Sequence, residues 1–276
     1  MTTEAQRDLW LVEEELRRDR VNEAAHLLGE LWEAVPARVG AERIDELRVA
    51  TEELGKRGST SPEVAEVFRR AARCCARNGH YRLARRMGIH ELAVWRKRSD
   101  NESTLLVRTF TGYRTALDGL ARIDRAVGRL HRVINCLDEL LELQARHGFA
   151  VNADSAWTLR ELGAVMLEAG RPDAAVRRYL SRADSFYVQL DESTAVIRQH
   201  ATCLVLSALA HRALDRPTEA DRCVNRALAV LLPTDPEAAA EVRVLTDESG
   251  TGDQLPVTTA LPLVQFGLPA WPHRPF

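Results

Sequence analysis

Histidine and cysteine side chains are the first candidates for chemistry in this sequence, because they ligate metals and act as bases or nucleophiles. His200 and Cys203 lie three residues apart, which places them on one face of a helix, and His211 points the same way. His200 and His211 are eleven residues apart, about 16 Å along a helix, and one ion cannot bridge that distance. We therefore expect no metal site here and interpret these side chains as core residues.

The cysteines do not form a redox motif. Cys74 and Cys75 are adjacent, so their side chains leave a helix in different directions. The chain has five cysteines, and an odd, scattered set suits reduced thiols in the cytoplasm. No phosphate-binding loop, nucleotide fingerprint or serine elbow is present in the sequence. We expect a binding protein without a cofactor; a helical-repeat enzyme or enzyme subunit acting on a peptide or small molecule is the alternative.

A basic segment runs from Arg69 to Arg98. Residues 67–98 contain 10 basic residues and a single acid, Glu91, although the net charge of the chain is −2. Such a segment can bind phosphates, and a turn at Asn78-Gly79-His80 between two helices would suit a helix-turn-helix. The nearly balanced overall charge argues against a nucleic acid, so a nucleic-acid-binding regulator is the least favoured function.

The elements that carry these residues are helices nearly everywhere up to residue 245. Apolar residues recur with the spacing of one helix face, and no β-branched stretch alternates with polar residues, so we predict no strands. Ser61-Pro62-Glu63 supplies an N-cap, a proline at the first helical position and an acid in the first turn. The pattern predicts about eleven helices: 3–18, 21–34, 41–56, 62–77, 81–97, 103–120, 123–146, 153–169, 172–188, 194–214 and 217–231. The helix over 123–146 is expected from Ile123, Val127, Leu130, Ile134, Leu137 and Leu141.

A spacing recurs through these helices. A small residue is followed seven positions later by a turn residue, and an alanine follows five positions after that. The copies are Gly163, Gly170, Ala175; Ala208, Asp215, Ala220; Ala72, Gly79, Ala84; a partial copy at Asp19, Ala24; and a weak one at Ala126, Leu130. Small residues are needed there because two helices joined by a tight turn approach closely only where neither carries a large side chain.

These positions resemble the tetratricopeptide repeat (TPR), and Leu159 to Ala183 carries the resemblance most clearly. The final alanine of that copy is expected at residue 182, where the chain has Arg182, and Ala183 follows one residue late. The distances between Ala84, Ala126, Ala175 and Ala220 are 42, 49 and 45 residues, whereas the family repeats every 34. The resemblance implies an all-α solenoid of antiparallel helical hairpins over residues 1–245.

In a solenoid of this type the first helix of each pair lines the concave side. The resemblance therefore implies a groove, and guanidinium groups in it would bind carboxylates in a bidentate manner. We expect an adaptor or regulatory scaffold that grips an extended, acidic protein or peptide segment, or a free C-terminal carboxylate. The expected binding residues are Arg69, Arg73, Arg77, Arg108, Trp157, Arg160 and Arg212.

The last part of the chain, residues 246–276, forms a separate region in the sequence. Five prolines favour an extended conformation, and the many apolar side chains favour burial against another surface. We expect an extended tail that caps the solenoid, fills its groove or binds a partner, including a second copy of the chain. No run approaches the roughly 18 apolar residues of a membrane span, and the N-terminus lacks the layout of a signal peptide. We expect a cytoplasmic protein with no membrane partner.

Overall fold

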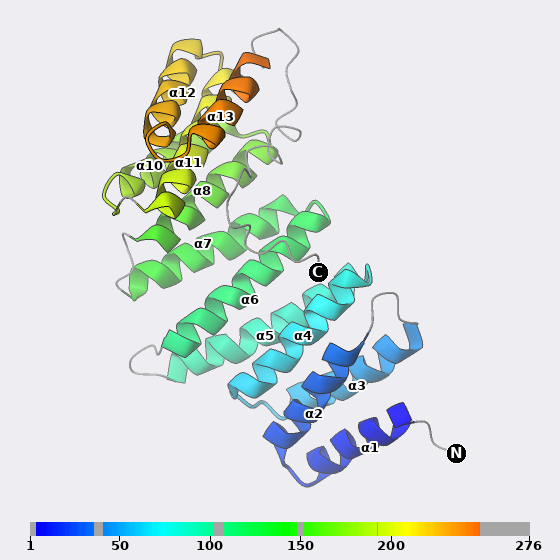
Figure 1. The fold of residues 1–276 in the computed structure, drawn as a ribbon. Helices are drawn as coiled ribbons and strands as arrows, with labels where there is room; N and C mark the ends of the chain where they lie inside the picture. The colour runs from blue at the N-terminus through cyan, green and yellow to red at the C-terminus, as the bar shows by residue number, and fades with distance from the viewer. Residues whose placement is uncertain (1–3, 36–40, 102–106, 148–151, 192, 249–276) are drawn as a thin grey trace. The chain divides into compact units, whose positions relative to one another are not determined.

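The computed structural model describes residues 4–35, 41–101, 107–147, 152–191 and 193–248. These ranges contain helices, turns and loops and no strand, which confirms the all-α prediction. The helices form two compact units, unit 1 up to Arg129 and unit 2 from Leu130 (Figure 1). Most of the predicted tail, residues 249–276, lies outside the described residues.

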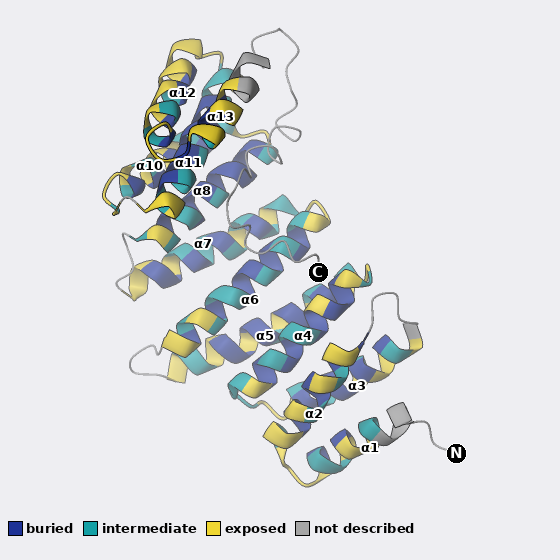
Figure 2. Cartoon of the chain, viewed as in Figure 1, coloured by how far each residue is buried: buried dark blue, intermediate teal, exposed yellow. Residues whose placement is uncertain are grey.

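The described residues of unit 1 form six helices. They are α1 (Glu4–Arg17), α2 (Val21–Ala34), α3 (Ala41–Lys56), α4 (Pro62–Arg77), α5 (Tyr81–Asn101) and α6 (Val107–Ala126). Helix α2 packs against α1 and α4, and α5 packs against α4 and α6. Helix α3 lies against α2, where the indole of Trp32 donates a hydrogen bond of 2.8 Å to Thr51. Each helix buries the apolar face that its sequence pattern predicts (Figure 2).

Unit 2 contains the remaining helices. They are α7 (Leu130–Arg146), α8 (Ala153–Glu168), a continuous helix made of α9 (Pro172–Ala174), η1 (Ala175–Leu180) and α10 (Ser181–Tyr187), and then α11 (Thr194–Ala213), α12 (Pro217–Leu231) and α13 (Pro236–Glu248). Helix α8 packs against α7 and against the continuous helix, and α12 packs against α11 and α13. No helix in the described ranges is both long and apolar enough to cross a membrane.

The turn position of the repeat has one conformation in every copy. Gly79 (φ 78°), Gly170 (φ 68°), Asp19 (φ 57°) and Asp215 (φ 56°) are all left-handed. At each, the amide of the following residue bonds to a carbonyl five residues back, the pattern that ends a helix in a Schellman motif. The alanine five residues after the turn is fully buried in all four copies. The predicted spacing therefore reflects one repeated helix–turn–helix geometry.

The weak copy in the middle of the chain was assigned to the wrong residues. The turn lies at Gly128 (φ 72°), so the small residue seven positions before it is Ala121 and the position five after it is Val133. The predicted single helix over 123–146 is wrong for the same reason, because α6 continues to Ala126 and α7 begins at Leu130. The apolar pattern continues across the break without a change of phase. It therefore does not indicate that a turn lies at Gly128.

The late alanine of the clearest copy has a structural cause. Residues 175–180 form a π-helical turn, in which the amide of Ser181 bonds to the carbonyl of Val176, five residues back. A π-helical turn takes up one residue more than an α-helical turn. Arg182 is consequently exposed, and Ala183 occupies the fully buried position.

Helix α13 was not predicted. Its start repeats a signal seen elsewhere: Asp235 caps the helix by accepting a 3.1 Å hydrogen bond from the amide of Ala238, and Pro236 is the first helical residue. Arg198 of α11 also binds the Asp235 carboxylate, which lies 7% exposed. Asp235-Pro236-Glu237 has the same pattern as Ser61-Pro62-Glu63, an N-cap residue followed by proline and an acid. This pattern could have revealed the helix.

Candidate functional site

Three of the predicted binding residues form a ridge on α4. Arg69, Arg73 and Arg77 are each four residues apart, so they follow one another along one side of the helix at intervals of about 6 Å. Ser61 fixes the start of this helix by accepting a hydrogen bond from the amide of Val64. Arg69 is half-buried, whereas Arg73 and Arg77 are exposed.

The arginines of this ridge differ in their partners. Arg69 is ion-paired with Glu66, one turn before it on the same helix. Arg73 and Arg77 form no ion pair with any carboxylate in the described ranges. The fourth predicted residue of unit 1, Arg108 on α6, lies 3.2 Å from Glu63 at the start of α4, and both side chains are exposed. Water screens such a pair, so Arg108 stays able to exchange partners.

A buried carboxyl group interacts electrostatically with two arginines of this ridge. Glu91 of α5 is only 5% exposed, and its charge interacts with Arg69 and Arg73. Burial raises the pKa of Glu91 to about 8, although the two guanidinium groups act in the opposite direction. Glu91 is therefore largely protonated at neutral pH and does not cancel the charge of Arg69 and Arg73.

Several of the other basic residues of this segment bond to residues outside it. Arg85 binds both oxygens of the fully buried Asp124, at 2.9 and 3.0 Å. Arg70 pairs with Glu33 and Glu66, Arg86 with Glu52, and Lys97 and Arg98 donate to backbone carbonyls. These contacts compete with a phosphate backbone for the cations, and the Asn78-Gly79-His80 turn belongs to the repeated hairpin. These contacts argue against nucleic-acid binding.

The three predicted residues of unit 2 lie on α8 and α11. Trp157 and Arg212 are half-exposed. Arg160, three residues after Trp157, is buried at 3% exposure and bonds to Glu161, while its Nε has no hydrogen-bond partner. The Tyr187 hydroxyl of α10 lies near it and is also unpaired. In unit 2, then, the predicted residues do not form an exposed ridge of the kind seen on α4.

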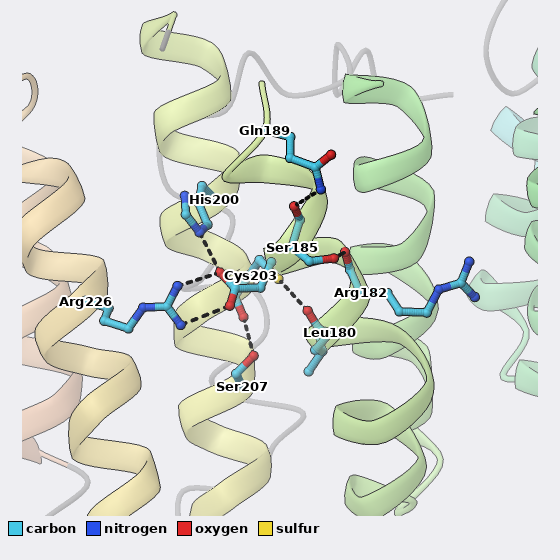
Figure 3. Close-up of polar contacts among 9 residues, drawn as sticks. Leu180, Arg182, Ser185, Gln189, His200, Cys203, Ser207 and Arg226 are labelled. Carbon is cyan, nitrogen blue, oxygen red and sulfur yellow. Dashed lines mark hydrogen bonds and ion pairs between the residues drawn. The ribbon is translucent and has the colours of Figure 1, made fainter. Parts of the chain in front are cut away.

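A polar cluster that the sequence did not reveal joins three helices of unit 2 (Figure 3). Asp184 of α10 accepts a 2.7 Å hydrogen bond from His200 of α11 and two of 2.9 Å from Arg226 of α12. The His200 ring also stacks on Tyr187, with centroids 5.6 Å apart. In the sequence, Asp184 looks like any acid on a helix surface, and no motif links it to partners 16 and 42 residues away.

The sulfur atom beside this cluster belongs to a buried thiol that is protonated at neutral pH. Cys203 donates a hydrogen bond to the carbonyl of Leu180, 23 residues away, and burial raises its pKa to about 12 (Figure 3). His200 bonds to Asp184 and Cys203 bonds to the carbonyl of Leu180, so the two side chains have different hydrogen-bond partners. Within the described ranges, no group of three histidine, cysteine or acidic side chains is arranged to hold a metal ion. The cluster acts as a cross-link between helices.

Comparisons with known proteins identify the fold. No protein-family model and no curated protein match the chain. BtubC (BKLC) from P. vanneervenii matches with a TM-score of 0.52 and 18% identity, over 83% of this chain and 91% of that one. A putative kinesin light chain from Podosopora anserina with nearly identical TPR-like repeats gives 0.51 and 17%, over 79% and 97%. At such low sequence identity, these structural matches concern the fold alone. They agree with the repeated hairpins, and the chain has a TPR-like helical-repeat fold.

Proposed function

We propose that this protein binds an extended acidic segment of another protein along the arginine ridge of α4. The observation that carries the proposal is the pair Arg73 and Arg77, which are exposed, one turn apart, and without a carboxylate partner in the described part of the chain. Stacked helical hairpins generally serve as protein-binding surfaces. Arg108 extends the ridge onto α6, where its exposed pair with Glu63 is open to exchange.

The spacing of the ridge selects a pattern of acids. Successive arginines on α4 stand about 6 Å apart along the helix axis. In an extended peptide, side chains on one side recur at every second residue, about 6.6 Å apart. A segment with acids at alternate positions therefore places one carboxylate opposite each of Arg69, Arg73 and Arg77. Each exposed pair contributes only about 0.2–1 kcal/mol, so binding depends on several pairs forming in register.

Trp157, Arg160 and Arg212 remain part of the proposal as a second contact region in unit 2. Arg160 is the weakest member, because a side chain at 3% exposure reaches a ligand only after it changes rotamer. A charge reversal at Arg160 would also leave a buried carboxylate and destabilise the fold. The decisive experiment is therefore placed on α4.

The test uses a fluorescent, N-terminally blocked peptide of five Glu-Ser repeats and measures its anisotropy with the full chain at low salt. We expect the Arg73→Glu/Arg77→Glu variant to lose about 2 kcal/mol of binding, or about thirtyfold in Kd, since attraction becomes repulsion at two positions. The control Arg82→Glu/Arg222→Glu makes the same change of charge at exposed positions on α5 and α12 and should bind normally. A peptide with the same glutamates in one block tests the spacing.

Two results would refute the proposal. If the control variant loses as much affinity as the α4 variant, the probe responds to net charge and not to the ridge. If wild type does not bind the alternating peptide at low salt, the ridge is not a site for acidic segments. Circular dichroism of both variants shows whether the helices are intact.

A further inference from the structure

Gly119 of α6 has no side chain at a point where the surface of the helix is open. A Cβ atom placed on this glycine would have no packed neighbour within 4 Å. Gly88 and Gly112 differ from it, because a Cβ atom there would clash with Leu120 and Trp95 of the facing helix. Glycine is less favourable than alanine inside a helix, so packing among the described residues does not account for Gly119.

Gly119 lies on the face of α6 that is turned towards α4. Arg108 precedes it by eleven residues, which places the two about 20° apart around the helix axis. The guanidinium of Arg108 lies 3.2 Å from the carboxylate of Glu63 at the start of α4. Thr115 and Arg122, four residues before Gly119 and three after it, share this face. The face therefore borders the helix that carries the arginine ridge.

The packing of both helices on α5 shows how far along α4 this opening lies. Phe68 of α4 stacks on His90 of α5, with ring centroids 5.1 Å apart. Leu120 of α6 lies against Gly88, which is two residues before His90, or about 3 Å along the axis of α5. Gly119 is consequently level with Phe68, where the arginine ridge begins.

The side chains around Gly119 suit an acidic chain. Asp118 is 5% exposed and pairs with Arg122 at 3.0 Å, so its negative charge is compensated within α6. Thr115 donates its hydroxyl hydrogen to the carbonyl of Thr111, and its oxygen can still accept a hydrogen bond from a peptide amide. This face therefore adds a hydrogen-bonding group beside the ridge without adding an uncompensated carboxylate.

We propose that Gly119 makes room for the acidic segment, which lies between α4 and α6. Its alternate acids face the arginine ridge, and the residues between them face α6, where the missing side chain lets the peptide backbone approach the helix. The inference rests on the proposed function and adds the second side of that site. Successive side chains of an extended chain point to opposite sides, so one segment can meet both helices. Glycine permits such a close approach to a backbone.

The experiment measures binding of the blocked Glu-Ser peptide to the full chain at low salt while the space at Gly119 is filled in steps. We expect Gly119→Trp to weaken binding about tenfold and Gly119→Ala to change it less than about twofold, because only the indole fills the opening. Ala229→Trp, the matched control, adds the same side chain at an exposed position of α12 and should bind like wild type. Urea denaturation should show that all three variants are folded.

A second measurement locates the ligand without a variant of the protein. A central serine of the peptide is replaced by a leucine analogue that carries a diazirine, and the cross-linked residues are identified by mass spectrometry after irradiation. We expect cross-links to α6 between Thr115 and Arg122. The same analogue in place of a central glutamate should cross-link to α4 instead.

The outcomes separate this inference from the proposed function. If Gly119→Trp binds like wild type, if Ala229→Trp loses as much affinity, or if the serine position does not cross-link to α6, the inference is overturned while the ridge remains a binding site. If wild type does not bind the peptide at low salt, the proposed function itself fails.

Discussion

Gly163 of α8 lies directly against Leu180 of η1. A Cβ atom placed on the glycine would stand 2.4 Å from Leu180 Cδ2 and 2.5 Å from its Cγ. Such distances are much shorter than a van der Waals contact. The Leu180 side chain is fully buried, so it cannot shift away without displacing its packed neighbours. The small residue of the clearest repeat copy is therefore a steric requirement of this helix pair.

Replacing Gly163 by alanine should destabilise the protein. The clash costs about 1–3 kcal/mol, and the better helix propensity of alanine returns up to about 1 kcal/mol of it. We expect a net loss of about 1–2 kcal/mol in the free energy of unfolding, measured by urea denaturation. Gly119→Ala in α6 is the matched control, since a Cβ there meets no atom within 4 Å. That variant should be as stable as wild type or more stable, and equal losses in both would contradict the steric explanation.

The turn position of the repeat offers a second test, in which one turn residue is changed to glycine and a glycine at another turn is replaced. Asp215 adopts φ 56°, a left-handed conformation that costs a non-glycine residue about 1 kcal/mol. Asp215→Gly should therefore raise the melting temperature slightly, and Gly170→Ala, at φ 68°, should lower stability by about 1 kcal/mol. The two turns have equivalent hydrogen bonds, so opposite signs are expected from opposite substitutions. Two changes of the same sign would show that another contact dominates at these turns.

The fold was predictable because its rules are local. A glycine or aspartate that ends one helix, followed by an alanine five residues on, fixes four of the hairpins without knowledge of distant residues. Gly128 escaped detection because Ile123, Val127 and Leu130 keep one apolar phase across the break. The ridge on α4 was predictable for the same local reason, since Arg69, Arg73 and Arg77 share a helix face.

What could not be predicted depends on contacts between helices. Whether an arginine pairs with an acid from another element, as Arg85 does with Asp124, follows from packing and not from spacing. The Asp184 cluster has the same origin, because its three members come from three helices. The burial of Glu91 also arises from helix packing; in sequence it is simply the acid among ten bases.

The π-helical turn leads to a third prediction, which concerns two neighbouring residues. Ala183 is fully buried and Arg182 is exposed, the reverse of what an uninterrupted α-helical repeat would require. Ala183→Leu should cost about 1–3 kcal/mol through overpacking, whereas Arg182→Leu should change the free energy of unfolding by less than about 0.5 kcal/mol. Thermal melts of the two variants followed by circular dichroism would distinguish them. The opposite order of effects would place the helix in the α-helical register.

The Asp184 cluster predicts a pH-dependent contribution to stability. Burial raises the pKa of Asp184, but the hydrogen bonds from His200 and Arg226 outweigh that effect and hold it below its usual value. A carboxyl group with a lowered pKa stabilises the fold above its unfolded pKa of about 3.9, and this stabilisation disappears as the pH falls through the folded value. Asp184→Asn should therefore cost about 1–3 kcal/mol at pH 7.

The same reasoning predicts how the stability cost of Asp184→Asn changes as the pH is lowered. The difference between wild type and Asp184→Asn, measured by urea denaturation, should shrink as the pH is lowered from 5 to below 3, because the wild-type carboxylate then takes up a proton. Asp173→Asn is the control: its pair with Arg177 on the same continuous helix is exposed on both sides, and such pairs contribute about 0–1 kcal/mol. If the Asp184→Asn cost is the same at pH 7 and pH 3, the carboxylate charge does not hold the three helices together, and packing of His200 on Tyr187 must do so instead.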